Sequence, residues 1–430
     1  MMGNRYDKYK DSGIAWIGEI PEHWNIVQLK RCSEFINGYA FNSNYFNKNT
    51  GIPVIRIGDI CNEKISFENI VYVQEDKDLD KFIVQKNDIL IAMSGATVGK
   101  IGIYEDENIA YINQRVGIIR AHQYDFIKRM FFTKGFTDYI SLSSAGSAQP
   151  NISSDEILNF YIPFPLKKEQ QTIAAYLDQK CGEIDELITL QEEMITKLQS
   201  YKQSVITEAV TKGLDKNAPL KDSGIEWIGK IPEHWVVKRL KYVCDFNPQN
   251  DQSISKLSEV GYLPMERLKN GYMLPSVISV SNLTQGLTFF KENDIVLAKV
   301  TPCFENGNIA IAKNLVNNCG FGSSELFVFR VKSINRKYLF YLLQEGKIKD
   351  VCKSTMIGTG GLKRISPIFM KNIQLPIPSL SEQQSIADYL DQRCSEIDEL
   401  ISIKQQKIEK LKEYKKSLIF ECVTGKRKVS

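Results

Sequence analysis

The sequence "SGIAWIGEIPEHW" (Ser12–Trp24) returns about half the chain later as "SGIEWIGKIPEHW" (Ser223–Trp235). A second segment, "EQQTIAAYLDQKCGEIDELI" (Glu169–Ile188), returns as "EQQSIADYLDQRCSEIDELI" (Glu382–Ile401). The sequences between these segments agree poorly. A solenoid would show many short periods, so that architecture is excluded. The chain is a tandem duplication in which near-constant segments frame a divergent region in each half, as expected if the scaffold is shared and recognition differs.

The second repeated segment predicts a long helix in each half. It follows a proline-rich turn, "IPFP" (Ile162–Pro165) or "LPIP" (Leu375–Pro378), and continues without proline. We place the helices at 166–213 and 379–426, with a linker at 214–221. A helix of roughly 65 Å needs a partner along its apolar stripe, and the obvious partner is its own copy. Packing along the surface of one domain is the alternative.

Antiparallel pairing would relate the two halves by a pseudo-twofold axis, as in a dimer fused into one chain. Gln191 and Lys404, at otherwise apolar heptad positions, would tune the register of the pair. The expected contacts between the helices are apolar or aromatic residues at heptad spacing: Leu177, Ile184, Leu187, Leu198, Tyr201, Leu390, Ile397, Leu400, Leu411 and Tyr414.

Each divergent region contains short β-type runs separated by glycine, such as "NDILIAMSGATVGKIGIY" (Asn87–Tyr104) and "ENDIVLAKVTPCFENGNIAIA" (Glu292–Ala312). We therefore predict an α+β fold class with an N-terminal domain at 1–165 and a C-terminal domain at 222–378. Each domain has a mixed β-sheet, and an antiparallel coiled coil of the two helices joins and spaces the domains. Polar side chains beside the glycine turns can read base edges, although a solvated loop carries the same residues.

The sequence shows no pattern typical of a metal, nucleophile or nuclease site. "SGATVGK" (Ser94–Lys100) lacks the first glycine of a phosphate-binding loop, and Ile101 replaces the hydroxyl that would bind magnesium. His23 and His234 are one repeated position beside a tryptophan, which favours packing or a structural hydrogen bond over acid–base chemistry. We expect the neighbouring Trp24 and Trp235 to pack the domain base. We expect no catalysis by this chain alone.

Composition narrows the class of protein further. The chain has 55 basic and 51 acidic residues, so an anionic partner must be met by local basic groups. The nine cysteines are scattered and contain no C-x-x-C pair, which favours reduced, mostly buried thiols in the cytoplasm. No segment has the character of a signal peptide or the length of a membrane span. We expect a cytoplasmic protein with no membrane partner.

Together, the repeats and the inserts resemble the specificity subunit of type I restriction-modification systems, over nearly the whole chain. In that family "IPEHWxxxxLK" opens a target recognition domain, as at Ile20–Lys30 and Ile231–Lys241. The "EQQ" segments at Glu169 and Glu382 match the start of its conserved helices. "DILIAMSGATVGKIGI" and "DIVLAKVTPCFENGN" resemble two kinds of recognition domain.

The resemblance implies that each recognition domain binds one half of a bipartite site in double-stranded DNA and that the helices fix the unspecified gap. It implies two methyltransferase subunits that methylate adenine with S-adenosylmethionine, and restriction subunits that hydrolyse ATP. These cofactors and magnesium would belong to the partner subunits and none to this chain. The alternatives are an enzyme with an atypical site, a stand-alone DNA-binding protein, and a coiled-coil scaffold that does not bind DNA.

The resemblance also guides the choice of residues expected to contact DNA, which are polar or basic and lie beside the glycine turns. In the N-terminal domain they are Ser94, Thr97, Lys100, Asn113, Gln114, Arg115, Gln149 and Asn151; in the C-terminal domain they are Lys299, Thr301, Asn306, Asn308, Ser323, Ser324, Lys363 and Arg364.

Overall fold

The chain folds into two compact units. The N-terminal unit contains residues 1–191 and 406–430, and the C-terminal unit contains residues 192–405. The computed structural model describes residues 5–61, 63–145, 150–250, 258–359 and 361–429. Two long helices, α4 (Lys167–Lys212) and α8 (Leu380–Val423), each contribute one segment to each unit.

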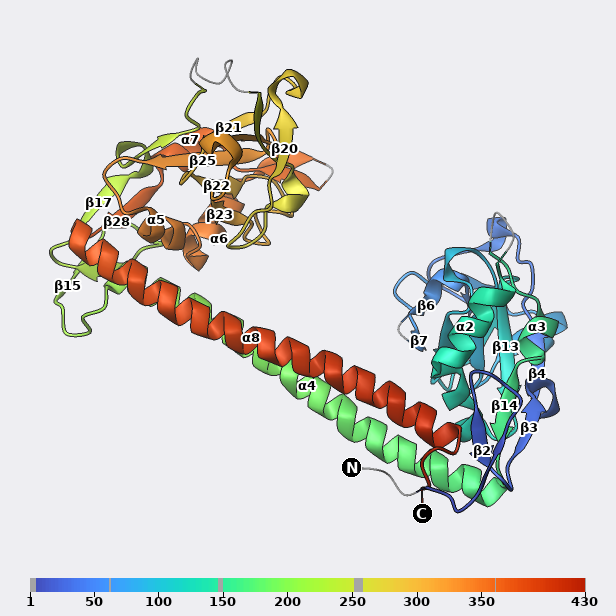
Figure 1. The fold of residues 1–430 in the computed structure, drawn as a ribbon. Helices are drawn as coiled ribbons and strands as arrows, with labels where there is room; N and C mark the ends of the chain where they lie inside the picture. Colours follow the sequence, from blue (N-terminus) through green and yellow to red (C-terminus); the bar gives the residue numbers. More distant parts are fainter. Residues whose placement is uncertain (1–4, 62, 146–149, 251–257, 360, 430) are drawn as a thin grey trace. The chain divides into compact units, whose positions relative to one another are not determined.

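Two mixed β-sheets form the body of the N-terminal unit (Figure 1). The larger sheet has the order β4 (Ser33–Asn37), β13 (Val116–Ala121), β10 (Ile89–Ala92), β11 (Ile101–Ile103), β7 (Glu63–Ile65) and β6 (Ile60–Cys61). The smaller has the order β8 (Val71–Val73), β5 (Ile52–Ile55), β12 (Ala110–Ile112) and β9 (Ile83–Val84). The pairs β11–β7 and β12–β5 are parallel and the others antiparallel. Strand β10 is buried along its whole length, as its continuous apolar run predicts.

The C-terminal unit repeats this topology although its sequence differs. One sheet has the order β18 (Cys244–Phe246), β25 (Leu326–Val331), β22 (Ile295–Ala298) and β23 (Ile309–Ile311), which corresponds to β4-β13-β10-β11. The other has the order β20 (Ser276–Ser279), β19 (Glu259–Leu263), β24 (Cys319–Gly322) and β21 (Thr288–Lys291), which corresponds to β8-β5-β12-β9. The regions that diverge in sequence are therefore one fold used twice.

The same turn precedes the central strand in both units. Asn87 and Asn293 have positive φ angles of 72° and 74°, a conformation that asparagine adopts more readily than most residues. The next residue, Asp88 or Asp294, is 2% exposed. Its carboxylate accepts hydrogen bonds from a backbone N–H three residues back and from an arginine on the neighbouring strand.

Two further pairs of strands form the base of each unit. The first repeated segment and the three residues before it make the hairpins β1 (Tyr9–Asp11) with β2 (Glu19–Pro21), and β15 (Leu220–Asp222) with β16 (Lys230–Pro232). The following strand pairs with the strand before the long helix: β3 (Asn25–Gln28) with β14 (Tyr161–Phe164), and β17 (Val236–Arg239) with β28 (Gln374–Ile377). Trp24 and Trp235 are fully buried at this base, so the expectation that they pack the domain is confirmed.

Short helices complete each unit. They are α1 (Tyr124–Ile127), α2 (Lys134–Ser143) and α3 (Ser154–Leu158) in the N-terminal unit and α5 (Arg336–Leu342), α6 (Gly346–Ser354) and α7 (Pro367–Asn372) in the C-terminal unit. The C-terminal unit also has a hairpin of β26 (Ile357–Thr359) and β27 (Leu362–Arg364). Serine caps the start of both α3 and α7, because Ser153 and Ser366 accept backbone hydrogen bonds there.

The long helices begin and end with repeated signals. Near their starts, the side-chain amides of Gln170 and Gln383 each donate to the carbonyl of the preceding turn's proline, at 2.8 Å. Soon after their ends, Gly213 and Gly425 have positive φ angles of 77° and 72°. Glycine reaches that conformation without steric cost, which explains the ends near these positions.

The two helices form an antiparallel coiled coil (Figure 1). In the N-terminal unit, Leu177, Cys181 and Ile184 of α4 share one core with Leu418 and Cys422 of α8. Inward positions on α4 follow one another at alternating steps of four and three residues. Among the expected contacts, Leu177, Ile184, Leu390 and Ile397 are buried, whereas Leu198 and Leu411 are half-buried.

Four of the expected residues are more exposed than the seam positions, although the Tyr201 hydroxyl of α4 still accepts a hydrogen bond from Arg393 of α8 at 3.4 Å. Leu187, Tyr201, Leu400 and Tyr414 are 42 to 51% exposed, and the inward places next to them belong to Ile188, Lys202, Ile401 and Lys415. The sequence has apolar residues both three and four positions after Ile184, and both lie on the same helix face. Cys181 is buried in the seam, and the residues seven and fourteen positions after it are Ile188 and Ile195. The seam therefore continues through Ile188, four residues after Ile184, and not through Leu187.

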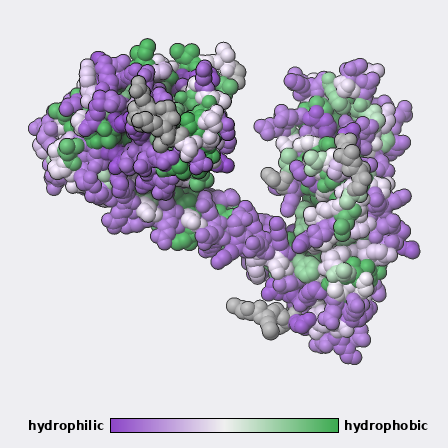
Figure 2. All heavy atoms as spheres, turned by 45° about the horizontal axis from the view of Figure 1, so that its top comes forward, coloured by the Kyte–Doolittle hydropathy of each residue, from purple (hydrophilic) through white to green (hydrophobic). Residues whose placement is uncertain are grey.

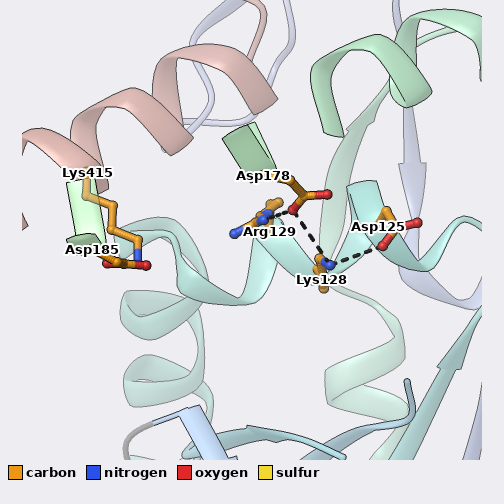
Figure 3. Close-up of polar contacts among 6 residues, drawn as sticks. All are labelled: Asp125, Lys128, Arg129, Asp178, Asp185 and Lys415. Atoms are coloured by element: carbon orange, nitrogen blue, oxygen red, sulfur yellow. Dashed lines mark hydrogen bonds and ion pairs between the residues drawn. The ribbon is translucent and has the colours of Figure 1, made fainter. Parts of the chain in front are cut away.

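Carboxylates on α4 fix the helix to the N-terminal unit (Figure 3). Asp178 pairs with Arg129, and its Oδ1 lies 3.9 Å from the Lys128 Nζ, which is also 3.1 Å from Asp125. Asp185 pairs with Lys415 of α8 at 2.7 Å. In the C-terminal unit the repeated position Asp391 accepts a hydrogen bond from Tyr341 and pairs with Lys337. Equivalent acidic positions thus hold helix and domain together in both units.

All nine cysteines carry thiols, and seven of these are buried. Burial raises the pKa of Cys32, Cys244, Cys352 and Cys422 to about 12, so these thiols stay neutral at physiological pH. On the face drawn in Figure 2, hydrophobic side chains are scattered in small groups among hydrophilic ones. Of the helices that the structure describes, none combines the length and apolar character needed to cross a bilayer.

Candidate nucleic-acid interface

Three segments of the N-terminal unit meet where the central strands end. They are the loop after β10 (93–100), the turn before β13 (113–115) and the segment before α3 (150–152). The Met93 N–H donates to the Arg115 carbonyl at 2.9 Å, and the Ile152 N–H donates to the Met93 carbonyl at 3.0 Å. The Gly95 N–H donates to the Pro150 carbonyl at 2.8 Å. We call this arrangement the three-segment edge.

The C-terminal unit has the same three-segment edge, built from 299–308, 323–325 and 363–365. The Lys299 N–H donates to the Glu325 carbonyl, and the Ile365 N–H donates to the Lys299 carbonyl, both at 3.0 Å. The Thr301 N–H donates to the Lys363 carbonyl at 3.0 Å. These bonds match those of the N-terminal unit one for one, so they align the two edges position by position.

The alignment shows that equivalent backbone positions carry different side chains. Arg115 corresponds to Glu325, Asn151 to Arg364, and Gly95 to Thr301. A shared backbone with exchanged side chains can present different hydrogen-bond donors and acceptors to two ligands of the same general shape. The sequence alone did not reveal this correspondence, because the loops after β10 and β22 differ in length.

In the N-terminal unit, the expected residues present unpaired polar groups at this edge. Lys100, Gln114, Arg115 and Asn151 are exposed, and within the described ranges neither Lys100 nor Arg115 forms an ion pair. The Ser94 hydroxyl is buried and has no hydrogen-bond partner among the described residues.

Of the other expected residues of this unit, Thr97 and Asn113 are described by the structure and Gln149 is not. The Thr97 hydroxyl donates to the Ser94 carbonyl at 3.4 Å, and Asn113 is half-buried in the turn. Gln149 lies outside the described residues, so its position is not assigned.

In the C-terminal unit, several expected residues are held by one another. The Arg364 Nε donates to the two carboxylate oxygens of Glu325 at 2.9 and 3.0 Å. The Lys299 Nζ donates to the Ser324 carbonyl at 2.7 Å. The Thr301 hydroxyl donates to the Gly361 carbonyl at 2.6 Å and accepts from the Lys363 N–H at 2.9 Å.

The remaining expected residues of the C-terminal unit lie around this network. Lys363, Asn306 and Ser324 are exposed, whereas Ser323 and Asn308 are half-buried. Sequence reasoning missed Glu325, which orients Arg364. The missed signal is that "SSE" before β25 takes the same place as "NQR" before β13.

These groups are suited to binding a polyanion with readable edges. Exposed lysines bind phosphates, arginine can donate two hydrogen bonds to guanine, and glutamine or asparagine can bind adenine. No cluster of three or more histidine, cysteine or acidic side chains able to hold a metal occurs in the part of the chain that the structure describes.

The two repeated histidines have the structural role expected for them. The His23 Nε2 lies 3.1 Å from Glu169, and the His234 Nε2 lies 3.0 Å from Glu382. Both glutamates lie at the starts of the long helices, so each histidine ties the domain base to a helix.

Comparison with known proteins identifies the class of this fold and site. Residues 21–199 and 232–413 match the family model of the type I restriction modification DNA specificity domain. The chain is 25% identical over 430 residues to the type I restriction enzyme MjaVIII specificity subunit of Methanocaldococcus jannaschii, which covers 95% of this chain and 94% of that protein. It is 31% identical to the EcoAI specificity subunit of Escherichia coli over 48% of this chain and 36% of that protein.

A chain from a structure of a type I R-M system, solved to explain complex assembly and conformational transition, shares the fold. The TM-score is 0.69 at 17% identity, and the match covers 94% of this chain and 98% of that chain. The family match covers both halves of the duplication. The protein therefore belongs to the family of type I restriction-modification specificity subunits, the non-catalytic DNA-recognition components of these systems.

Proposed function

We propose that each three-segment edge contacts one half of a bipartite DNA site, the N-terminal edge one half and the C-terminal edge the other. The observation that supports this most directly is the correspondence of the two edges, in which one hydrogen-bonded backbone frame carries Arg115 at the position of Glu325 and Asn151 at that of Arg364. A common frame would meet the duplex in the same manner twice. The exchanged side chains would then select different bases.

Within each edge we assign different tasks to the exposed and the fixed side chains. Lys100 and Lys363 are exposed ends of flexible side chains, which suits phosphate contacts that set orientation. Arg115, Gln114 and Asn151 are the candidates for base contacts in the N-terminal domain. In the C-terminal domain, Arg364 is pre-oriented by Glu325, which reduces the entropy lost when it binds a base.

The chain would act within a larger enzyme. We propose that two methyltransferase subunits and the restriction subunits join it, and that S-adenosylmethionine, ATP and magnesium bind to those partners. We propose a functional division into recognition domains at 1–165 and 222–378, spacer helices at 166–213 and 379–426, and a linker at 214–221. A cytoplasmic location follows from the need to reach chromosomal DNA.

Single substitutions test the proposal at one half-site at a time. The half-sites are first identified from adenine methylation in cells that carry the complete system. Duplexes with either half-site scrambled then report binding to the other half. Arg115→Ala should weaken binding through the N-terminal half-site by about 1 to 3 kcal/mol if it donates two hydrogen bonds to guanine.

The matched control is Lys363→Ala, which removes a cation from the other edge. It should weaken only binding that depends on the C-terminal half-site, and it should reduce the salt dependence of that binding. If each variant weakened both half-sites equally, the assignment of one edge to one half-site would be wrong. If neither variant changed DNA binding, the interface itself would be misplaced.

A further inference from the structure

The hairpin of β26 and β27 is an exposed part of the C-terminal edge. All six strand residues are exposed, including Ile357 at 77% and Leu362 at 52%. Exposed aliphatic side chains in isolation are ordinary on a protein surface. Two of them on one exposed two-stranded ribbon, within the interface region, suggest a ligand.

The strand register assigns the side chains to two faces. Ile357 pairs with Arg364 and Thr359 pairs with Leu362, and paired residues of antiparallel strands point to the same side. One face therefore carries Ile357, Thr359, Leu362 and Arg364. Lys363 lies on the other face, opposite Gly358.

The face of Lys363 is thin because its partner is glycine. A Cβ at Gly358 would lie 2.1 Å from the Leu362 carbonyl oxygen, so no larger residue fits there without a shift of the backbone. The ribbon is therefore narrow, with a single long cationic side chain on one face.

Several bonds fix β27 and the residue just before it, Gly361, to the edge. The Thr301 side chain bonds to the backbone of Gly361 and Lys363, and Glu325 binds Arg364. The Ile365 N–H donates to the Lys299 carbonyl directly after β27. The exposure of the aliphatic side chains thus belongs to a pre-organised element rather than to a frayed one.

We propose that the β26–β27 ribbon enters the major groove of the C-terminal half-site, where Ile357 and Leu362 contact the C5 methyl groups of thymines. The inference rests on the proposed function. The major groove admits a two-stranded β-ribbon, and apolar contact is how side chains recognise the thymine methyl group. Lys363 then lies on the opposite face, where it can bind a phosphate at the groove wall.

A protein partner is the competing occupant of this apolar surface. Charge favours DNA, because the segment from Met356 to Arg364 contains two cations and no carboxylate, and Lys363 remains as a cation when Glu325 is bound to Arg364. Its location also favours DNA, since the ribbon is hydrogen-bonded to the loop that carries Lys299 and Thr301.

The experiment replaces thymine by deoxyuridine, which removes only the C5 methyl group. Binding of the wild-type chain, assembled with its methyltransferase partner, is measured on duplexes substituted in the C-terminal half-site alone. We expect a loss of about four-fold for each contacted methyl group. The double variant Ile357→Ser, Leu362→Ser should bind the normal and substituted duplexes equally.

Two controls separate this result from a loss of folding or of the general function. Ile368→Ser alters another exposed isoleucine, 75% exposed on α7 of the same unit, and should retain the sensitivity to deoxyuridine. Deoxyuridine in the N-terminal half-site should affect the wild type and the double variant alike.

Three outcomes would overturn the ribbon proposal while DNA recognition by the edges stands: a C-terminal half-site without thymine, unchanged wild-type affinity on deoxyuridine, or a double variant that keeps full methyl sensitivity. A double variant that fails to assemble with the methyltransferase subunit would instead assign the surface to a protein contact. Failure of the edge proposal is recognised separately, by unchanged DNA binding of the Arg115 and Lys363 variants.

Discussion

At the scale of single residues, one buried carboxylate organises the centre of each sheet. The Asp88 side chain is 3% exposed and accepts two hydrogen bonds from Arg120 of β13, at 2.6 and 2.8 Å, and one from the Gln85 N–H. Asp294 and Arg330 form the same pair in the C-terminal unit. The pair joins the central strand to its neighbour at the end of these strands that lies away from the interface loops, so it fixes the sheet that carries the edge.

Asp88→Asn should destabilise β10 and β13 by about 2 to 3 kcal/mol. The amide keeps the shape and can still accept from the Gln85 N–H, but it removes the carboxylate charge that is hydrogen-bonded to Arg120. Hydrogen exchange of the β10 and β13 amides measures this local loss. Glu107→Gln is the control, since Lys86–Glu107 is a solvent-exposed pair, and it should leave exchange unchanged. Equal acceleration in β22 of the other unit would contradict a local role.

Residue-level prediction from the sequence succeeded where one chemical property decides the role. Trp24 and Trp235, each beside a repeated histidine, were expected in the domain base, and both are buried. Glu325 was missed because its role depends on Arg364, which lies 39 residues away in the sequence and becomes its neighbour only in the folded edge. A carboxylate in a region that should bind DNA is unfavourable alone, and only the structure shows that it orients an arginine.

At the scale of elements, the sequence indicates where the long helices begin and end more accurately than which of their residues face the partner helix. Proline-rich turns and glycines mark the ends of a helix locally, so the observed bounds differ from the expected ones by only a few residues. The inward face depends on which residues of the partner helix fill the seam. Leu187 and Ile188 compete for one place, and the sequence around them does not decide between them.

The corrected seam predicts opposite results for these two neighbours. Ile188→Ala should destabilise the coiled coil by about 2 kcal/mol, because this half-buried side chain packs against the N-terminal core. Leu187→Ala, at 42% exposure, should change stability by less than about 0.5 kcal/mol. Thermal unfolding of the two variants side by side checks the phase. A larger effect at Leu187 would restore the heptad assignment expected from the sequence.

At the scale of the whole molecule, the duplication keeps the side chains that recognise DNA separate from the helices that space the two domains. The sheets share one topology and one hydrogen-bonded edge, whereas their surface side chains differ. The first halves of the two helices keep nearly the same sequence in both copies. Selection for two different half-sites can therefore alter the loops without disturbing the spacer. The half-site sequences themselves do not follow from the chain, because one side chain reads different bases at different approach angles.

If the helices set the unspecified gap, lengthening both of them should lengthen it. One heptad inserted after Gln191 and another after Lys404 preserves the alternation of the seam and adds about 10 Å to each helix, or roughly three base pairs of B-DNA. Methylation should then occur at the same two half-sites separated by a longer gap. The control adds the heptad after Gln191 alone, which leaves seven residues of α4 without partners and should impair assembly. The recognition domains and the phase of the coiled coil are the same in the wild type and in the double insertion. An unchanged gap in the double insertion would therefore show that other contacts set the distance between the half-sites.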